Sequence, residues 1–335
     1  MRPYRDRIRL LVVLLMAVAV AVAGCGSGGG SSAVSKPVLD QDFPDPDVLH
    51  VDGTYYAYAT QRKDGSSNAQ LATSTDLKTW EVAEQDPLPK LPDWATTGRT
   101  WAPDVAAVDD GYLMYLTAWD LESARQCIGV ARSDSPMGRF TPVGTDPLIC
   151  PTRRGGAIDA ATFVERDGTR YLLWKNDGNC CGKPTWIHLQ RMSTDGLRTT
   201  GRASRLIRQD RAWEGELVEA PTLVRRGSSY VLFYSANSYG DGSYATGYAV
   251  AERLRGPYVK ADRPLLTTAT TGITGPGGQD VVADPSGKTY LVFHGWNKAR
   301  IYRGMYVAEL NWRATVPTLT PLVKARPSAV QNRHS

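Results

Sequence analysis

The 335-residue sequence has only four histidines, at scattered positions, and its five cysteines form no C-x-x-C pair. Both features argue against a zinc site, which needs closely spaced nitrogen and sulfur ligands. The sequence also lacks a Gly-x-Ser-x-Gly segment and an evident cysteine–histidine pairing. A hydrolase that uses a serine or cysteine nucleophile is therefore not expected.

Long apolar runs are also scarce, and the clearest one, Leu10 to Ala23, has 14 residues. It follows the basic segment MRPYRDRIR and is too short to span a bilayer as a helix. The residues Val22-Ala23-Gly24-Cys25 then resemble a bacterial lipobox. We predict a signal peptide over residues 1–24, lipidation at Cys25 and an extracytoplasmic, membrane-anchored protein. The alternative is an ordinary secretory signal with an incidental cysteine.

The positive charge of the chain comes largely from this leader. Without residues 1–24, Lys+Arg falls from 39 to 35 and Asp+Glu from 34 to 33, so the net charge falls from +5 to +2. This charge gives no reason to expect a nucleic-acid partner. Residues 25–36, rich in Gly and Ser, are predicted to form a flexible tether between the anchor and the folded body.

Four cysteines remain after Cys25, and four cysteines allow three disulfide pairings. We favour Cys127 with Cys150, because each flanks a strand-like segment within one stretch of the chain. The adjacent Cys180 and Cys181 then form either a strained vicinal disulfide or two free thiols.

A repeated pattern runs through the rest of the sequence. Each copy has a short apolar run, a polar turn with glycine and a Tyr-rich alternating run, which is typical of a β-hairpin. The turn glycines are Gly53, Gly111, Gly168, Gly227 and Gly287, at intervals of 58, 57, 59 and 60 residues. We predict a single all-β domain, a five-bladed β-propeller over residues 37–325, followed by a tail at 326–335. A pair of β-sandwiches would not give five equal periods.

One position of this repeat carries acids in three of the five copies. Eight or nine residues before the turn glycines, the sequence has Asp45, Ala102, Asp159, Glu219 and Gly278. Because the innermost strands of a propeller face one central channel, we expect the three acids to converge there. The alternative is three solvated turn acids that share a register by chance.

Three converging carboxyl groups suit glycoside hydrolysis. That reaction commonly uses two carboxyls on opposite sides of the scissile bond. A third can raise a neighbour's pKa by repulsion between like charges.

The order and phase of the motifs resemble glycoside hydrolase family 43. The motifs are FPDPDVL, WAPDV, IDAATFVERDGTRYLLWK, EAPTLVRRGSSYVLFYSAN and GPGGQDVVADPSGKTYLVFHGW, and they cover all five predicted blades. The resemblance implies an inverting glycosidase for arabinose- and xylose-containing polysaccharides. It assigns Asp45 as general base, Glu219 as general acid, and Asp159 as the group that tunes the pKa of Glu219 and orients it.

Several neighbouring residues receive weaker assignments. Asp47 and Asp104 lie two residues out of phase, and we expect structural hydrogen bonding for them. Glu214 and Glu216 are the nearest alternatives to Glu219, which is favoured by phase and by motif. The candidate sugar-binding residues are Trp101, Trp119 and Asn237. For Trp119 and Trp213, packing between blades is the favoured interpretation.

The resemblance also implies a metal candidate. His294 matches a histidine that contacts an ion, usually calcium, in arabinan-cleaving relatives, and water would supply the remaining ligands. The alternative is a histidine hydrogen-bonded in the channel. Where some relatives have a histidine in the GPG phrase, this chain has Gly278-Gln279. No cofactor is expected for the chemistry itself, and a structural calcium ion in the channel is the one candidate.

The favoured function is that of a monomeric α-L-arabinofuranosidase or arabinanase acting on arabinan or arabinoxylan. A β-xylosidase is less favoured, because long xylosidases of the family add a β-sandwich domain that Pro327 to Ser335 cannot form. A non-catalytic glycan-binding lipoprotein would not need a matched acid, base and tuning group. A fructan-active propeller would resemble a Trp-Met-Asn-Asp-Pro start, which is missing.

Overall fold

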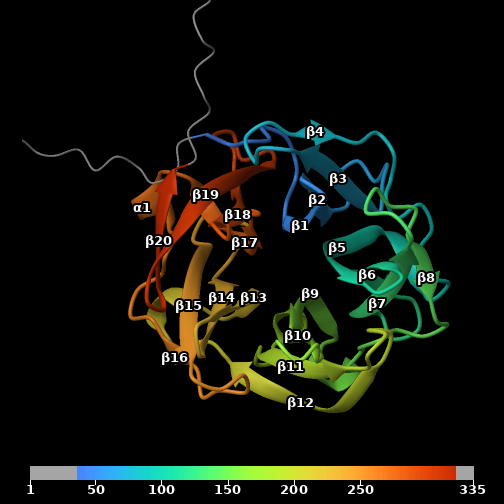
Figure 1. Ribbon diagram of the computed structural model, residues 1–335. Helices are drawn as coiled ribbons and strands as arrows, with labels where there is room; N and C mark the ends of the chain where they lie inside the picture. The colour runs from blue at the N-terminus through green and yellow to red at the C-terminus, as the bar shows by residue number, and fades with distance from the viewer. Residues whose placement is uncertain (1–35, 322–335) are drawn as a thin grey trace, which may run out of the picture. The chain divides into compact units, whose positions relative to one another are not determined.

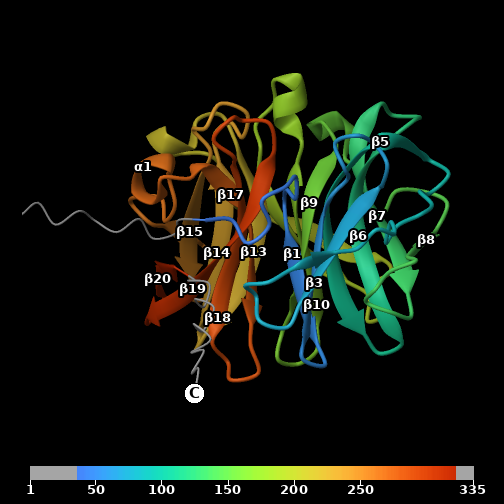
Figure 2. The same ribbon diagram turned by 90° about the horizontal axis from the view of Figure 1, so that it is seen from above.

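The computed structural model describes residues 36–321, and within them twenty strands form five four-stranded antiparallel sheets around a central axis. Figure 1 looks along this axis, and Figure 2 shows the strands running beside it. The prediction of a five-bladed propeller is confirmed. The predicted signal peptide, Cys25, almost all of the tether and the C-terminal tail lie outside the described residues. No helix in the described residues is both long and apolar enough to cross a membrane.

Each blade is built from four consecutive strands, with the first strand innermost. The first blade contains β1 (Asp47–Val51), β2 (Thr54–Thr60), β3 (Ala69–Ser74) and β4 (Glu81–Val82). The second contains β5 (Ala95–Val108), β6 (Gly111–Asp120), β7 (Arg125–Ser133) and β8 (Thr141–Val143). The third contains β9 (Ala157–Val164), β10 (Arg170–Asn176), β11 (Ile187–Met192) and β12 (Thr199–Ile207).

The remaining two blades follow the same order. The fourth contains β13 (Val218–Arg226), β14 (Ser229–Ala236), β15 (Ala245–Ala251) and β16 (Val259–Lys260). The fifth contains β17 (Thr274–Ala283), β18 (Thr289–Trp296), β19 (Arg303–Arg313) and β20 (Val316–Pro321). The described helices are short: η1 (Thr152–Arg154), η2 (Gly178–Cys181), η3 (Ala212–Glu214) and α1 (Thr268–Thr271).

The turn glycines that reveal the repeat sit where the backbone requires them. Gly111, the first residue of β6, has φ of 119°, and a Cβ there would lie 2.5 Å from the carbonyl oxygen of Ser133. A side chain would therefore be strained by the backbone and blocked by β7. This explains why glycine marks the hairpin.

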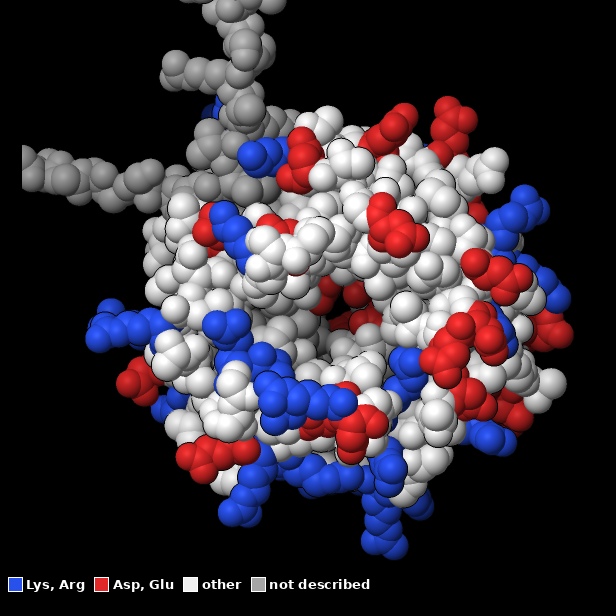
Figure 3. Space-filling view, viewed as in Figure 1, with Lys and Arg blue, Asp and Glu red and all other residues white. Residues whose placement is uncertain are grey.

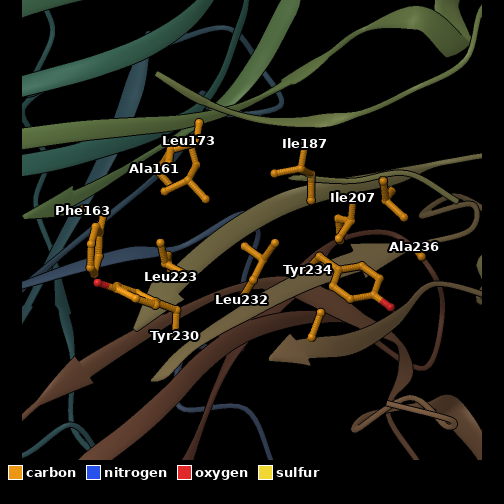
Figure 4. Close-up of a cluster of buried hydrophobic side chains, with 13 residues drawn as sticks. Ala161, Phe163, Leu173, Ile187, Ile207, Leu223, Tyr230, Leu232, Tyr234 and Ala236 are labelled. Atoms are coloured by element: carbon orange, nitrogen blue, oxygen red, sulfur yellow. The ribbon is translucent and has the colours of Figure 1, made fainter. Parts of the chain in front are cut away.

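Adjacent blades are held together by apolar faces. Between the third and fourth blades, Leu173 and Leu232 are fully buried, and the rings of Phe163 and Tyr230 meet edge to face with centroids 6.0 Å apart (Figure 4). Burial of such side chains stabilises each by about 1.5–3 kcal/mol. The blades are thereby fixed against one another, and so are the inner strands that carry the acids.

The ring closes through the segment that precedes β1. Leu39 pairs with Met305 of β19, and Val38 donates a 2.8 Å hydrogen bond to the Met305 carbonyl. The segment leading into β9 makes the same kind of bridge, from Ile149 to Ile128 of β7. The first and fifth blades are therefore joined as consecutive blades are joined elsewhere.

Candidate active site

A residue with left-handed backbone geometry lies within four of the inner strands and just before the fifth, β1. These residues are Asp45 (φ 54°), Ala102 (40°), Asp159 (55°), Ala220 (47°) and Gly278 (56°). In β5, β9, β13 and β17 the pairing register shifts at this point, as in a β-bulge. Left-handed geometry costs a non-glycine residue about 1–2 kcal/mol. Strain of this kind is concentrated at functional sites.

This geometry corrects one sequence-based prediction. The repeat position in the fourth blade is held by Ala220, and Glu219 is the residue before it. Counting back from the turn glycine misled because the hairpins differ in length: Ala220 lies seven residues before Gly227, and Asp159 lies nine before Gly168. Glu219 therefore occupies the same position in its blade as Trp101 does in the second blade, one residue before the bulge.

The second strands link four of the five left-handed positions to the neighbouring blade. The bulge N–H of Ala102 donates to Thr60 Oγ1 (2.9 Å), that of Asp159 to Thr117 Oγ1 (3.2 Å), that of Gly278 to Ser235 Oγ (2.9 Å) and that of Asp45 to His294 Nδ1 (3.0 Å). Each acceptor belongs to the blade before the donor. The bulges are thus positioned by a series of contacts around the ring.

Asp45 is surrounded by nitrogen groups of the fifth blade. Its Oδ1 lies 3.2 Å from His294 Nδ1 and 3.4 Å from an Arg303 guanidinium nitrogen, and Thr60 donates a 2.8 Å hydrogen bond to Oδ2. Burial opposes ionisation, but the charge of Arg303 and the hydrogen bond from Thr60 outweigh it and hold the pKa of this carboxyl well below its usual range. Asp45 is therefore a carboxylate at neutral pH, as a general base must be.

Glu219 is paired with a buried cation. Lys175 Nζ lies 2.8 Å from Glu219 Oε2 and 3.6 Å from Asp177 Oδ1, and the lysine side chain is completely buried. Burial disfavours an ammonium, yet Glu219, Asp159 and Asp177 together raise the pKa of Lys175. The lysine is therefore charged.

Asp159 lies beside this pair. Its Oδ2 accepts a 2.9 Å hydrogen bond from the N–H of Ala220. Burial, followed by the negative charge of Glu219, raises the pKa of Asp159 to about 8. Asp159 can therefore hold a proton at neutral pH beside Glu219 and Lys175.

These acids line one cavity of about 640 Å³, which also contains Trp101 and Asn237. Figure 3 shows the hollow at the centre of the ring with acidic side chains inside it. We call Asp45, Asp159 and Glu219 the cavity trio. The sequence predicted that these three would converge, and the structure places them together.

The other sequence candidates are placed differently. Trp119 does not line this cavity, and the Arg99 guanidinium lies 4.2 Å from its ring centroid. Trp213 packs against the apolar cluster of the third and fourth blades. Of the two alternative acids, Glu216 lines the cavity, whereas Glu214 is buried and binds Lys260 and the Tyr234 hydroxyl.

A second trio of acids lies two residues after the left-handed position in the first, second and fifth blades. Asp47, Asp104 and Asp280 each accept a hydrogen bond from the next blade, from the N–H groups of Val105 (2.8 Å), Thr162 (2.9 Å) and Val48 (2.9 Å). Asp47 and Asp104 thus have the structural hydrogen bonds that we expected for them. Asp280 was not singled out from the sequence.

The surroundings of His294 do not favour a directly bound metal ion. Nδ1 accepts the N–H of Asp45, so the ring proton is on Nε2, which is buried and has no hydrogen-bond partner among residues 36–321. A protonated ring nitrogen cannot coordinate a cation. In residues 36–321, three clustered ligand atoms occur only at Asp120, Cys127 and Cys150, and these two cysteines form a disulfide. Cys180 is joined to Cys181 within η2, at the cavity wall.

Sequence reasoning missed Lys175, Asp177, Tyr244 and Arg303, all of which line the cavity. For Lys175 a signal was present, because a lysine ends the apolar run YLLWK of an inner hairpin. Such a lysine is almost never fully buried without a charged partner. For Arg303 no comparable local signal exists, since its partner Asp45 is 258 residues away.

Comparisons with known proteins agree with this arrangement. The sequence profile described as "Glycosyl hydrolases family 43" matches residues 34–315. The chain is 24% identical over 295 residues to extracellular endo-alpha-(1->5)-L-arabinanase 1 of Bacillus subtilis (strain 168), covering 82% of this chain and 86% of that protein. It is 33% identical over 157 residues to xylosidase/arabinosidase 43A of Humicola insolens, covering 43% of this chain and 46% of that protein. A crystal structure of a thermostable family-43 glycoside hydrolase matches with a TM-score of 0.75 at 27% identity, covering 88% of this chain and 99% of that chain.

Proposed function

The chain belongs to glycosyl hydrolase family 43, and on that premise we propose that it hydrolyses α-L-arabinofuranosyl linkages of arabinan-type polysaccharides or oligosaccharides with inversion. The observation that carries this proposal is the cavity trio, which shares one cavity while Asp45 and Glu219 have different charged partners. Different surroundings allow identical functional groups to act as acid and as base at the same pH.

In the proposed reaction, Asp45 removes a proton from a water molecule on the face of the sugar opposite the leaving group. The ionised state of Asp45, held by Arg303 and Thr60, supports this role. Glu219 donates its proton to the glycosidic oxygen as the bond to the sugar breaks. Asp159 orients the acid, because it accepts a hydrogen bond from Ala220, the residue that follows Glu219.

The preference for arabinofuranosides is supported by the endo-arabinanase of Bacillus subtilis, whose match extends over most of both proteins. A second candidate is a β-xyloside, because the Humicola insolens relative named xylosidase/arabinosidase has the higher identity, although over a shorter segment. Trp101 and Asn237 would contact the sugar in either case, since both line the cavity.

The test compares aryl α-L-arabinofuranoside, aryl β-D-xyloside and linear arabinan as substrates of the purified protein. We expect turnover of an arabinofuranoside and, by proton NMR, the anomer of inverted configuration as the first product. Turnover of the xyloside alone would change the substrate assignment. Release of the retained anomer would refute the single displacement, and sugar binding without turnover would indicate a glycan-binding protein.

We further propose that the protein is anchored to the outer side of a membrane through lipidated Cys25, as a monomer. The lipobox-like residues that end at Cys25 support this. The protein should partition into a detergent phase and carry a lipid-sized mass increment at Cys25. Cys25→Ala should release it, and a Cys25→Ala protein that still fractionates with membranes would refute the anchor.

A further inference from the structure

Lys175 interrupts the contacts that link the bulges around the ring. Thr60, Thr117, Ser235 and His294 have equivalent positions on the second strands, and each accepts the bulge N–H of the next blade. In the third blade, this position is occupied by Lys175, which pairs with Ile158 as Thr117 pairs with Trp101. An ammonium group has no lone pair and cannot accept a hydrogen bond.

The fold compensates for the missing acceptor. The bulge N–H of the fourth blade, at Ala220, donates instead to Asp159 Oδ2 at 2.9 Å. A threonine or serine at position 175 would complete the ring of contacts without a buried charge. Burial of a charged group is costly unless the group is paired. A departure from the repeat that places a cation here therefore indicates a functional role.

The lysine acts on one particular oxygen of Glu219. Nζ contacts Oε2 at 2.8 Å, while Oε1 makes no hydrogen bond in the described residues. Since Glu219 lines the cavity, Oε1 is the oxygen available to a ligand. The other titratable groups close to this pair are Asp159 and Asp177. The negative charge of Glu219 also acts to raise the pKa values of Tyr244 and His294.

We propose that Lys175 is a positioning residue for the proton donor. It holds Oε2 so that the proton is delivered from Oε1, and it stabilises the carboxylate that remains after transfer. The proton moves to the glycosidic oxygen, and this oxygen keeps the electron pair of the bond that breaks. Lys175 itself keeps its protons. The inference rests on the proposed function, because it takes Glu219 as the general acid.

The test replaces Lys175 with methionine, which has similar length and no charge, and measures aryl glycosides with different leaving groups. A dinitrophenolate departs with little proton donation, whereas an unactivated phenol needs it. Because general acid catalysis contributes 10²–10⁴-fold, we expect Lys175→Met to slow the poor leaving group about 100-fold and the good one less than about 10-fold. The basic limb of the pH–rate profile should move to higher pH, since the trio would lose its neighbouring cation.

Ser235→Ala is the matched control, because Ser235 has the same position in the fourth blade and its Oγ accepts the bulge N–H of Gly278. We expect this variant to lose stability and to slow both leaving groups by the same factor. Lys175→Arg keeps a cation and should therefore retain part of the rate on the poor leaving group that Lys175→Met loses. Equal slowing of both leaving groups by Lys175→Met would show that the lysine is merely structural and would overturn the proposal.

A second measurement separates this proposal from the proposed function. Carboxyl-carbon NMR can follow the pH titration of Glu219, with its signal assigned by its loss in Glu219→Gln. The midpoint should move upward in Lys175→Met, whether or not the protein turns over any glycoside tested. An unchanged midpoint would refute the influence of Lys175 even in an active enzyme, whereas a shifted midpoint in an inactive protein would refute only the glycosidase assignment.

Discussion

The cavity trio and the second trio both consist of acids from the innermost part of the blades, but only the first blade contributes to both, and their surroundings differ. In the cavity trio, Asp45 lies beside Arg303 and His294, and Glu219 lies beside Lys175. Within residues 36–321, the acids of the second trio form no ion pair, and each accepts a hydrogen bond from a backbone N–H. In the first blade, two residues along the chain separate Asp45, which has charged partners, from Asp47, which joins two blades.

The pKa values follow these partners. Against the effect of burial, the pKa of Asp45 is lowered by the charge of Arg303 and by the hydrogen bond from Thr60. Burial and neighbouring carboxylates raise the pKa of Asp104 to about 7 and that of Asp47 well above its usual value. The comparison teaches that a repeat position predicts where an acid points, whereas its partners decide whether it is charged.

The largest expected difference between the trios is in activity after an acid is replaced by its amide. We expect Asp45→Asn and Glu219→Gln to lower kcat/KM by about 1,000-fold or more, because each removes a proton-transfer group. Asp104→Asn should remain within about 10-fold of the parent protein, since the hydrogen bond from Thr162 can be kept by the amide oxygen. Steady-state kinetics on an aryl arabinofuranoside checks this, and an inactive but folded Asp104→Asn would place the second trio in the chemistry.

The same substitutions should change stability in opposite directions. The folded-state pKa of Asp45 is depressed, so its carboxylate stabilises the fold above about pH 4, and this stabilisation is lost as the pH falls through the folded-state value. Asp45→Asn should therefore lower the free energy of unfolding at pH 8 by about 1–3 kcal/mol.

Asp104 has the opposite sign. Its folded-state pKa of about 7 means that stability declines as the pH rises from about 4 to 7, and the full cost is present above that range. Asp104→Asn should therefore stabilise the protein at pH 8 by about 1–2 kcal/mol and have little effect at pH 4. Denaturant unfolding at both pH values measures this. Equal effects of Asp104→Asn at both pH values would show that Asp104 does not titrate in this way.

The smallest expected effect concerns metal ions. His294 Nδ1 is occupied by the N–H of Asp45, and one oxygen of each acid in the second trio is occupied by a backbone N–H. We therefore expect removal of divalent ions by a chelator to change neither kcat nor the unfolding midpoint. Loss of activity on chelation, restored by calcium, would show that one of these regions binds an ion after a rearrangement.

The fold could be predicted from the sequence because its hairpins carry periodic glycines, such as Gly111 and Gly168. The convergence of Asp45, Asp159 and Glu219 followed from that period. The register of Glu219 could not be derived, since the bulge and the unequal hairpin lengths shift it by one residue. The partners could not be derived either: Lys175 and Glu219 are 44 residues apart and meet only because two blades pack together.

The closure of the ring between Leu39 and Met305 also determines when the site is complete during synthesis. Asp45 emerges from the ribosome among the first residues of the propeller, but His294 follows 249 residues later and Arg303 follows 258 residues later. A nascent chain that has formed four blades therefore has its carboxylate without either partner. Hydrolytic activity should begin only once the fifth blade has been made and has docked beside the first.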